Sequence, residues 1–250
     1  MRRLLVCIAL LPLATLAASN ATTLGYNKTL HLAWSAFCNE SALQAWDCQW
    51  CTGAFAHPRV QLTQYLKDVK AGTQGYVAVI GSEKKIVVAY RGSKNLANTV
   101  EDAEFWMVKP PFGTAGVRTE AGFTAAYLSL RKATVHGLTA ARAQCGSNCS
   151  LLFTGHSLGA AMATMAAADL TLEGEESSLF TFGSPRVGNS EFKSWAQGRL
   201  STSMRMRRQL DIVPAIPPRG FGFDYEHVSH EIWNKHADGE PDSYVMCDGS

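Results

Sequence analysis

The sequence lacks a strong excess of charge, a low-complexity tract and a Pro-, Gly- or Ser-rich linker. Its 250 residues carry 23 Lys and Arg against 21 Asp and Glu, and both surplus positive charges, Arg2 and Arg3, lie at the N-terminus. Because nucleic-acid binding needs a basic surface, this near neutrality argues against a nucleic-acid partner. The missing linker favours one domain, and a hydrophobic content of 46% supplies its core.

The N-terminus has the pattern of a secretory signal peptide. Two arginines precede an apolar run over residues 4–18, and small residues follow at plausible cleavage positions. The run contains Pro12 and is shorter than the roughly 20 residues of a membrane span, although a signal anchor or a buried helix is the alternative. We predict a signal peptide over 1–19, a mature domain over 20–250 without a transmembrane span, and secretion to the extracellular space.

Seven cysteines are an odd number, but Cys7 would leave with the signal peptide. Cys48 and Cys51 lie in CQWC, where neither a second CxxC nor a βαβ setting supports a zinc or redox motif. Cys145 and Cys149 flank a turn-forming triplet. We therefore predict two short disulfide loops and no metal site. Asn-x-Ser/Thr sequons favour a secreted glycoprotein; they begin at Asn20, Asn27, Asn39 and Asn148.

Strand and helix patterns alternate through most of the chain. The β-rich runs 76–80 and 85–90 flank a hairpin signal. Further predicted strands are 151–154, 179–182 and 204–210, and predicted helices are 119–143, 158–172 and 189–200. This alternation predicts an α/β fold with a mainly parallel sheet that helices cover on both faces.

One short motif carries a specific chemistry. Gly155-His156-Ser157-Leu158-Gly159 follows an apolar strand and opens an Ala-rich helix, which is the setting of a G-x-S-x-G nucleophile elbow. The turn exposes the serine Oγ, the glycines permit close backbone approach, and the helix N-terminus directs free N–H groups at the site. We predict Ser157 as the nucleophile and the Leu158 N–H as an oxyanion donor; a passive serine in a Gly-rich turn is the alternative.

A serine nucleophile needs a base and an orienting acid, and in this kind of fold the acid follows the serine in the chain. Asp211 comes after a predicted strand and before Ile212-Val213-Pro214, so a Pro-fixed loop can present its carboxylate at the sheet edge. Asp169 lies inside the helix after the elbow, and Asp224 and Glu226 lie in an aromatic loop. We predict Asp211 as the acid; a turn-forming aspartate is the alternative.

With these residues in place, the chain resembles the fungal-type (class 3) lipases, which include the related feruloyl esterases, from about residue 30 to 250. The matching segments are Tyr90-Arg91-Gly92-Ser93, Gly122-Phe123 with Tyr127, the elbow, Phe182 to Asn189, Asp211 to Pro214, and His227 to Trp233. The resemblance implies an α/β-hydrolase fold and ester hydrolysis by a Ser–Asp–His triad without metal or organic cofactor. It also assigns Ser93 to the oxyanion hole and residues 95–108 to a lid; a turn serine and an ordinary surface helix are the alternatives.

The resemblance places several expected partners beyond the last residue, Ser250. The family's catalytic histidine comes later than the last matching segment, so the triad histidine is unassigned and expected beyond Ser250. His227 matches a family position that is not the base, and two later histidines have no counterpart, His230 and His236. The family partners of Cys38 and Cys247 also lie beyond Ser250, or else these two cysteines pair with each other. We predict that the C-terminal end is incomplete.

The predicted function is that of a secreted serine carboxylester hydrolase, most similar to a triacylglycerol lipase. Its partner would be an ester lipid, met at a lipid–water interface. The alternative is a catalytically weak or inactive lipase-like protein that binds lipid or a protein partner. A secreted serine peptidase would share the nucleophile, but the surrounding motifs do not support it.

Overall fold

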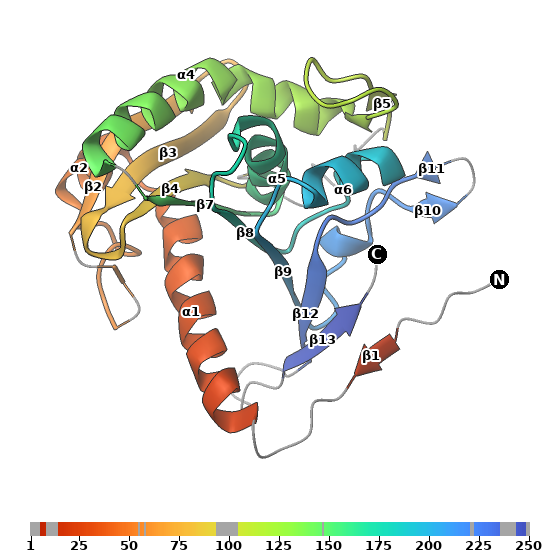
Figure 1. The fold of residues 1–250 in the computed structure, drawn as a ribbon, viewed down its shortest axis with the longest axis horizontal. Helices are drawn as coiled ribbons and strands as arrows, with labels where there is room; N and C mark the ends of the chain where they lie inside the picture. Colours follow the sequence, from red (N-terminus) through yellow and green to blue (C-terminus); the bar gives the residue numbers. More distant parts are fainter. Residues whose placement is uncertain are drawn as a thin grey trace.

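The computed structural model describes residues 6–8, 15–54, 56–57, 59–93, 105–146, 148–220, 223–235 and 244–248. Its centre is a nine-stranded sheet in the order β1-β13-β12-β9-β8-β7-β4-β3-β2 (Figure 1). The strands are β1 (Val6–Ile8), β2 (Val60–Asp68), β3 (Thr73–Ile80), β4 (Lys85–Tyr90), β7 (Ser150–His156), β8 (Ser177–Phe182), β9 (Thr202–Arg208), β12 (His230–Asn234) and β13 (Tyr244–Asp248). The neighbours β4, β7, β8, β9 and β12 run parallel, and antiparallel strands extend both edges.

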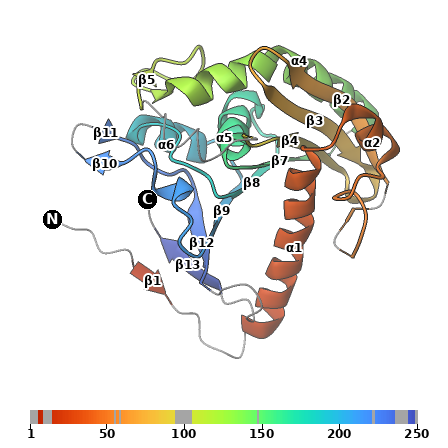
Figure 2. The same cartoon turned by 180° about the vertical axis from the view of Figure 1, so that it is seen from behind.

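Helices cover both faces of this sheet, as predicted (Figures 1 and 2). On one face lie α4 (Ala121–Cys145), α5 (Leu158–Leu170) and α6 (Ser190–Gln197). On the other lie α1 (Thr15–Ser35) and α2 (Glu40–Ala45). Each layer has its own apolar cluster, one with α4, α5 and α6 and one with α1 and α2. We call these two sides the α5 face and the α1 face.

The strands supply both clusters because successive side chains of a strand point to opposite faces. Every residue of β3 is buried. Toward the α5 face point Val77, Val79, Ile86, Val88 and Tyr90, whereas Tyr76, Ala78, Ile80, Val87 and Ala89 point toward the α1 face. A strand that is buried on both sides has a continuous apolar sequence rather than an alternating one, which explains the apolar runs at 76–80 and 85–90.

Helix α5 is buried almost entirely. Of its residues, all except Leu158 and Asp169 are buried, as predicted from its apolar composition. Six of its 13 residues are alanine, so its axis can lie close to the sheet. The helix thereby fixes the position of its own N-terminus, which is where the elbow serine lies.

Most of the predicted helices and strands are present, and their ends differ from the predicted ranges by a few residues. The predicted helix 119–143 is α4, the helix 189–200 is α6, and the strand 204–210 ends at Arg208. After the matching segment begins at His227, strand β12 starts only at His230. Ser229 has a φ of 84°, a left-handed conformation that cannot continue a strand.

Residues 6–8 and 15–19 of the predicted signal peptide lie in regular secondary structure. Helix α1 runs through the predicted cleavage site after residue 19, and β1 pairs antiparallel with β13, with Cys7 opposite Cys247. The signal peptide over 1–19 stays a prediction. Within the described ranges, no helix combines the length and apolar character that a membrane crossing requires.

The disulfides agree with the two predicted loops and correct one alternative. Cys145 is bonded to Cys149, and Cys51 is bonded to Cys48. Cys38 lies in bonding contact with Cys48, so its pairing with Cys247 is wrong. Cys247 is itself disulfide-bonded on β13.

Candidate active site

The elbow has the strained backbone geometry of a strand–turn–helix nucleophile motif. Ser157 stands between β7 and α5 with φ 55° and ψ −124°. Its N–H donates to the carbonyl oxygen of Phe182 at 3.0 Å, and its own carbonyl accepts from the N–H groups of Ala160 and Ala161 at 2.9 and 3.2 Å. A non-glycine residue at positive φ persists only where the surroundings hold it, and such residues cluster at functional sites. The strain lies at the predicted nucleophile.

Glycines allow three backbone segments to meet around this serine. A Cβ on Gly155 would overlap the backbone of Gly159, and a Cβ on Gly159 would overlap the carbonyl oxygen of Tyr90. A Cβ on Gly92 would lie 2.7 Å from the carbonyl oxygen of His156. The close approach of β4, β7 and α5 therefore depends on the absence of these side chains, as predicted for the elbow glycines.

Both predicted oxyanion residues lie in segments that approach Ser157. Leu158 is the first residue of α5, where N–H groups have no partner within the helix. Ser93 follows β4 directly after Gly92, and a Cβ built on Gly92 would lie 3.4 Å from the Cβ of Ser157. The structure thus brings the 92–93 segment and the start of α5 to the same serine.

Arg91 holds this segment in place, a role that the sequence analysis did not assign. Its buried guanidinium donates to the carbonyl oxygen of Gly92 at 3.3 Å, to Gln74 Oε1 at 3.1 Å and to the carbonyl oxygen of Gly72. Burial lowers the pKa of Arg91 from its ordinary value. The arginine ties the end of β4 to the β2–β3 hairpin, so it fixes the backbone next to Ser93.

Asp211 lies in the loop after β9. Its N–H donates to the carbonyl oxygen of Arg208 at 2.9 Å, and its Oδ1 accepts from the Val213 N–H at 3.0 Å. The short 3-10 helix Val213–Ala215 follows at once and contains Pro214 in its first turn. The loop is therefore fixed from both sides. The bond from the Val213 N–H to Oδ1 is the one that a turn-forming aspartate makes, so the role of Asp211 as the acid stays a prediction.

His156 lies near this carboxylate, a proximity that was not predicted from the sequence. A Cβ on Gly183 would lie 2.8 Å from Asp211 Oδ2 and 3.6 Å from His156 Nε2, so the two groups flank the same glycine. Nδ1 of the same ring would lie 3.4 Å from a Cβ on Gly92. Burial lowers the pKa of His156, while the Asp211 carboxylate opposes the shift. The sequence contains one sign of this arrangement: a variable position of the G-x-S-x-G motif holds a titratable side chain, that of His156.

A cavity of about 530 Å³ opens next to these two groups. Its lining consists of Leu30, Trp34, His156, Phe182, Gly183, Met206, Arg208, Gln209, Leu210 and Asp211. The indole of Trp34 on α1 stacks on the His156 ring, with centroids 5.0 Å apart and planes inclined by 22°. Ser157 is not among the lining residues and is 3% exposed. In the described part of the chain, Asp211 and His156 therefore form part of the cavity wall, whereas Ser157 is covered.

The two described histidines after Asp211, His227 and His230, lie apart from this arrangement. His227 is buried, and its Nε2 contacts the carbonyl oxygen of Pro214 at 2.8 Å. Burial and the neighbouring arginines, first of them Arg205, hold its pKa well below the ordinary value. His230 is exposed on β12, and His236 lies outside the described residues.

The predicted lid lies mostly outside the described part of the chain. Residues 94–104 are not described. At its end, β5 (Met107–Val108) pairs with β6 (Thr119–Glu120), and Trp106 is 68% exposed.

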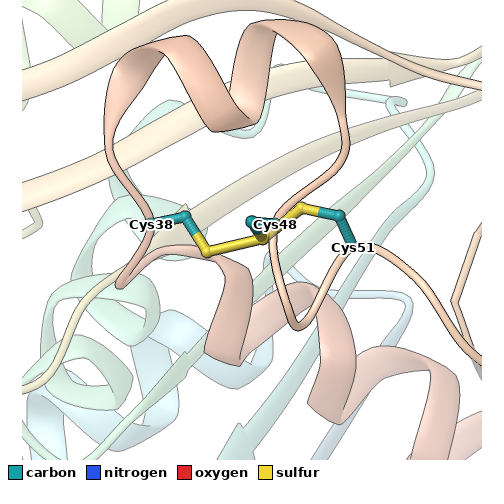
Figure 3. Close-up of side chains that lie close together, drawn as sticks. All are labelled: Cys38, Cys48 and Cys51. Atoms are coloured by element: carbon teal, nitrogen blue, oxygen red, sulfur yellow. A yellow bond between two sulfur atoms is a disulfide. The ribbon is translucent and has the colours of Figure 1, made fainter.

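One group of potential metal ligands occurs within the described ranges. The sulfur atoms of Cys38, Cys48 and Cys51 lie within 4.8 Å of one another (Figure 3). These residues belong to the α1–α2 region, not to the elbow or the Asp211 loop.

Comparison with known proteins identifies relatives of this chain. The model of the family Lipase (class 3) matches residues 87–221. A secreted mono- and diacylglycerol lipase 1 from Fusarium solani is 35% identical over 187 residues, which are 72% of this chain and 54% of that protein. The chain spans about half the length of the curated relatives it matches.

Solved structures show the same fold. The crystal structure of a lipase from Rhizopus microsporus var. chinensis has a TM-score of 0.80 at 26% identity, and the match covers 92% of this chain and 78% of that one. A triacylglycerol lipase whose catalytic centre is formed by a serine protease triad has a TM-score of 0.80 at 27% identity, with 98% and 87% covered. The α/β-hydrolase fold that the sequence resemblance implied is confirmed.

Proposed function

Since the chain belongs to the class 3 lipase family, we propose that it is a serine carboxylester hydrolase that acts on acylglycerols or similar ester lipids. The observation that carries the proposal is the conformation of Ser157, held at positive φ between β7 and α5. The mono- and diacylglycerol lipase and triacylglycerol lipase among its relatives support the substrate class.

The site residues have distinct roles in this reaction. Ser157 Oγ attacks the ester carbonyl and gives its proton to an imidazole base. The N–H groups of Leu158 and Ser93 stabilise the oxyanion of the tetrahedral intermediate. Collapse of this intermediate releases the alcohol, which takes the proton from the base, and water then hydrolyses the acyl-enzyme. Asp211 orients the imidazole and stabilises its protonated form.

Two histidines are candidates for this base. The sequence resemblance assigns it to a residue after Ser250, and that assignment stays a prediction. Among the described residues, His156 is an imidazole that lies next to Asp211, with its pKa below the ordinary value and hence neutral near pH 7. A neutral imidazole can accept a proton, so substitution of His156 tests whether this ring takes part in turnover.

Turnover of a short-chain nitrophenyl ester by the purified full chain tests the proposal, together with labelling by a fluorophosphonate probe. Ser157→Ala should abolish labelling and lower kcat by on the order of 10⁴- to 10⁶-fold. Asp211→Asn should cost on the order of 10⁴-fold. The matched control is Asp224→Asn, an exposed carboxylate next to Ser190, which should leave kcat unchanged.

The outcomes separate the candidates. Turnover that survives Ser157→Ala contradicts the nucleophile assignment. A loss in His156→Gln as large as that in Ser157→Ala identifies His156 as the base, whereas an intact kcat excludes it.

A catalytically weak or inactive lipid-binding protein is the second candidate, and the 3% exposure of Ser157 favours it. This candidate predicts neither turnover nor probe labelling by the full chain, but retention on vesicles of neutral acylglycerol and phospholipid. Turnover that depends on Ser157 contradicts it.

We also place the protein outside the cell. The secreted relatives support this location, as does the signal-peptide pattern of residues 1–19. N-terminal sequencing of the protein from culture medium tests it, and a chain that is retained in cells and still begins at Met1 contradicts it.

A further inference from the structure

Another cavity of about 530 Å³ lies between α1 and the central sheet, and we call it the α1 cavity. It lies near the N-terminal ends of β7, β8 and β9, whereas Ser157 follows the C-terminal end of β7. It shares no lining residue with the cavity beside Asp211. Its volume is within the range of about 300–1,000 Å³ that small-molecule sites have in proteins. The lining residues that matter for a ligand are Tyr26, Lys28, Leu152, Ser178, Phe180 and Met204.

One side of the α1 cavity is apolar. On the sheet, Phe180 of β8 pairs with Met204 of β9, and Leu152 of β7 pairs with Ser178 of β8. The ring of Tyr26 on α1 lies 5.8 Å from the ring of Phe180, measured between centroids. An alkyl chain that lies on these side chains is removed from water, and so is the apolar surface beneath it.

Three hydrogen-bond donors line the same cavity and have no partner in the part of the chain that the structure describes. They are the hydroxyls of Tyr26 and Ser178 and the ammonium group of Lys28. Tyr26 is 5% exposed, and its burial raises the pKa of the hydroxyl to about 12, so the hydroxyl keeps its proton at neutral pH. Buried donors in proteins nearly always have an acceptor. A carboxylate accepts several hydrogen bonds, so one such group can serve more than one of these donors.

The charged groups of the α1 cavity sum to one positive charge. Glu83 contacts Lys85 Nζ at 3.0 Å through Oε2 and His57 Nδ1 at 2.9 Å through Oε1. Burial lowers the pKa of His57, although Glu83 opposes the shift, so the ring is neutral near pH 7. Glu83 therefore compensates the charge of Lys85, and the charge of Lys28 is left over. A ligand with one negative charge matches this balance.

We propose that the α1 cavity binds the anion of a fatty acid. Its carboxylate accepts hydrogen bonds from Lys28 and Tyr26, and its alkyl chain lies on Leu152, Phe180 and Met204. A small anion would leave the apolar side of the cavity in contact with water, and an uncharged chain would leave Lys28 without a counter-charge. A fatty acid is also the product of the proposed ester hydrolysis, but binding in this cavity does not depend on that reaction.

Isothermal titration calorimetry of the full chain tests the two halves of this recognition. The ligands are octanoate, octan-1-ol and acetate, of which the alcohol lacks the charge and acetate lacks the chain. Octanoate should bind, octan-1-ol at least about tenfold more weakly, and acetate not measurably. Equal affinity for octanoate and octan-1-ol overturns the role of the charge, and equal affinity for octanoate and acetate overturns that of the apolar side. Absence of octanoate binding overturns the site.

Two variants remove the polar contacts and keep the apolar side. Lys28→Met should raise the Kd for octanoate about tenfold and abolish the preference over octan-1-ol, because it deletes the uncompensated charge. Tyr26→Phe removes one hydroxyl and should raise Kd about fivefold. The matched control is Lys132→Met, which removes the same charge from an exposed position on α4 and should leave Kd unchanged. If both cavity variants fold and bind octanoate like the parent, the proposal fails.

A photoreactive fatty acid locates the bound chain. On irradiation, octanoate with a terminal diazirine should modify Leu152, Phe180 or Met204, and mass spectrometry of the labelled peptides identifies the position. Labelling confined to the cavity beside Asp211, for example at Leu210, overturns the proposal. Ester turnover does not enter these measurements, so a chain that hydrolyses no ester and still binds octanoate in the α1 cavity counts against the proposed function alone.

Discussion

The two faces of the central sheet are built in different ways. On the α5 face, a helix rich in alanine lies so close to the strands that Gly159 has no room for a Cβ. On the α1 face, larger groups fill the space, among them the rings of Trp34 and Trp50 and the sulfurs around Cys48. The close face fixes the position of the nucleophile, and the face with larger side chains supplies the groups next to it.

The difference matters because close backbone packing and side-chain packing respond differently to change. A backbone that contacts another backbone can yield only by moving a whole element, whereas a stacked ring can change its rotamer. We therefore expect the α5 face to be intolerant of added atoms, and the α1 face to absorb substitutions with smaller losses of stability.

The largest effect on folding should follow from Gly159→Ala. The added methyl group would overlap the carbonyl oxygen of Tyr90, so α5 must move away from β4 or the chain must fail to fold. We expect a loss of unfolding free energy on the order of 4 kcal/mol or more. Urea denaturation followed by circular dichroism measures it. A variant as stable as the parent would show that the two backbones are not in contact.

The elbow was predictable from sequence because its determinants are local. The glycines, the serine and the apolar strand and helix around them lie within about one supersecondary unit. Asp211 was predictable for a similar reason, since a strand end and a following Pro-rich turn restrict where its carboxylate can point. In both cases the residues that are adjacent in the sequence form the strand, helix or turn that was predicted around the side chain.

The contacts that sequence could not predict cross between distant elements. His156 and Asp211 come near each other around Gly183, which follows β8 and lies where a side chain would overlap the Asp211 carboxylate. Likewise, Cys38 meets Cys48 through the way in which α1 and α2 pack, whereas the family resemblance placed its partner elsewhere. Such contacts depend on the register of the sheet and on helix packing, which a pattern of residue types does not encode.

Acid sensitivity should also differ between the faces. Burial and nearby arginines hold the pKa of His227 well below its ordinary value, whereas the Asp211 carboxylate partly opposes the same shift at His156. Since the unfolded chain binds the proton first below about pH 6.5, stability should fall as the pH decreases through that region, by at most about 1.4 kcal/mol per pH unit for each histidine. His227→Gln keeps an N–H donor for the carbonyl oxygen of Pro214 but does not titrate.

Urea midpoints of the parent, His227→Gln and His156→Gln between about pH 7 and about pH 5 measure this difference. We expect His227→Gln to flatten the pH dependence more than His156→Gln. The opposite ranking would mean that the arginines near His227 do not act on its ring and that the α1 face carries the acid sensitivity.

The smallest effect, and the only gain, should come from Gly25→Ala in α1. A Cβ at this position would meet no atom within 4 Å, and the residue is exposed inside a helix. Alanine removes the backbone freedom that glycine has in the unfolded chain, so stability should rise by about 0.5–1 kcal/mol. The same substitution, glycine to alanine, would then have opposite signs on the two faces. A loss at Gly25 as large as that at Gly159 would mean that α1 packs as closely as α5, and the distinction between the faces would fail.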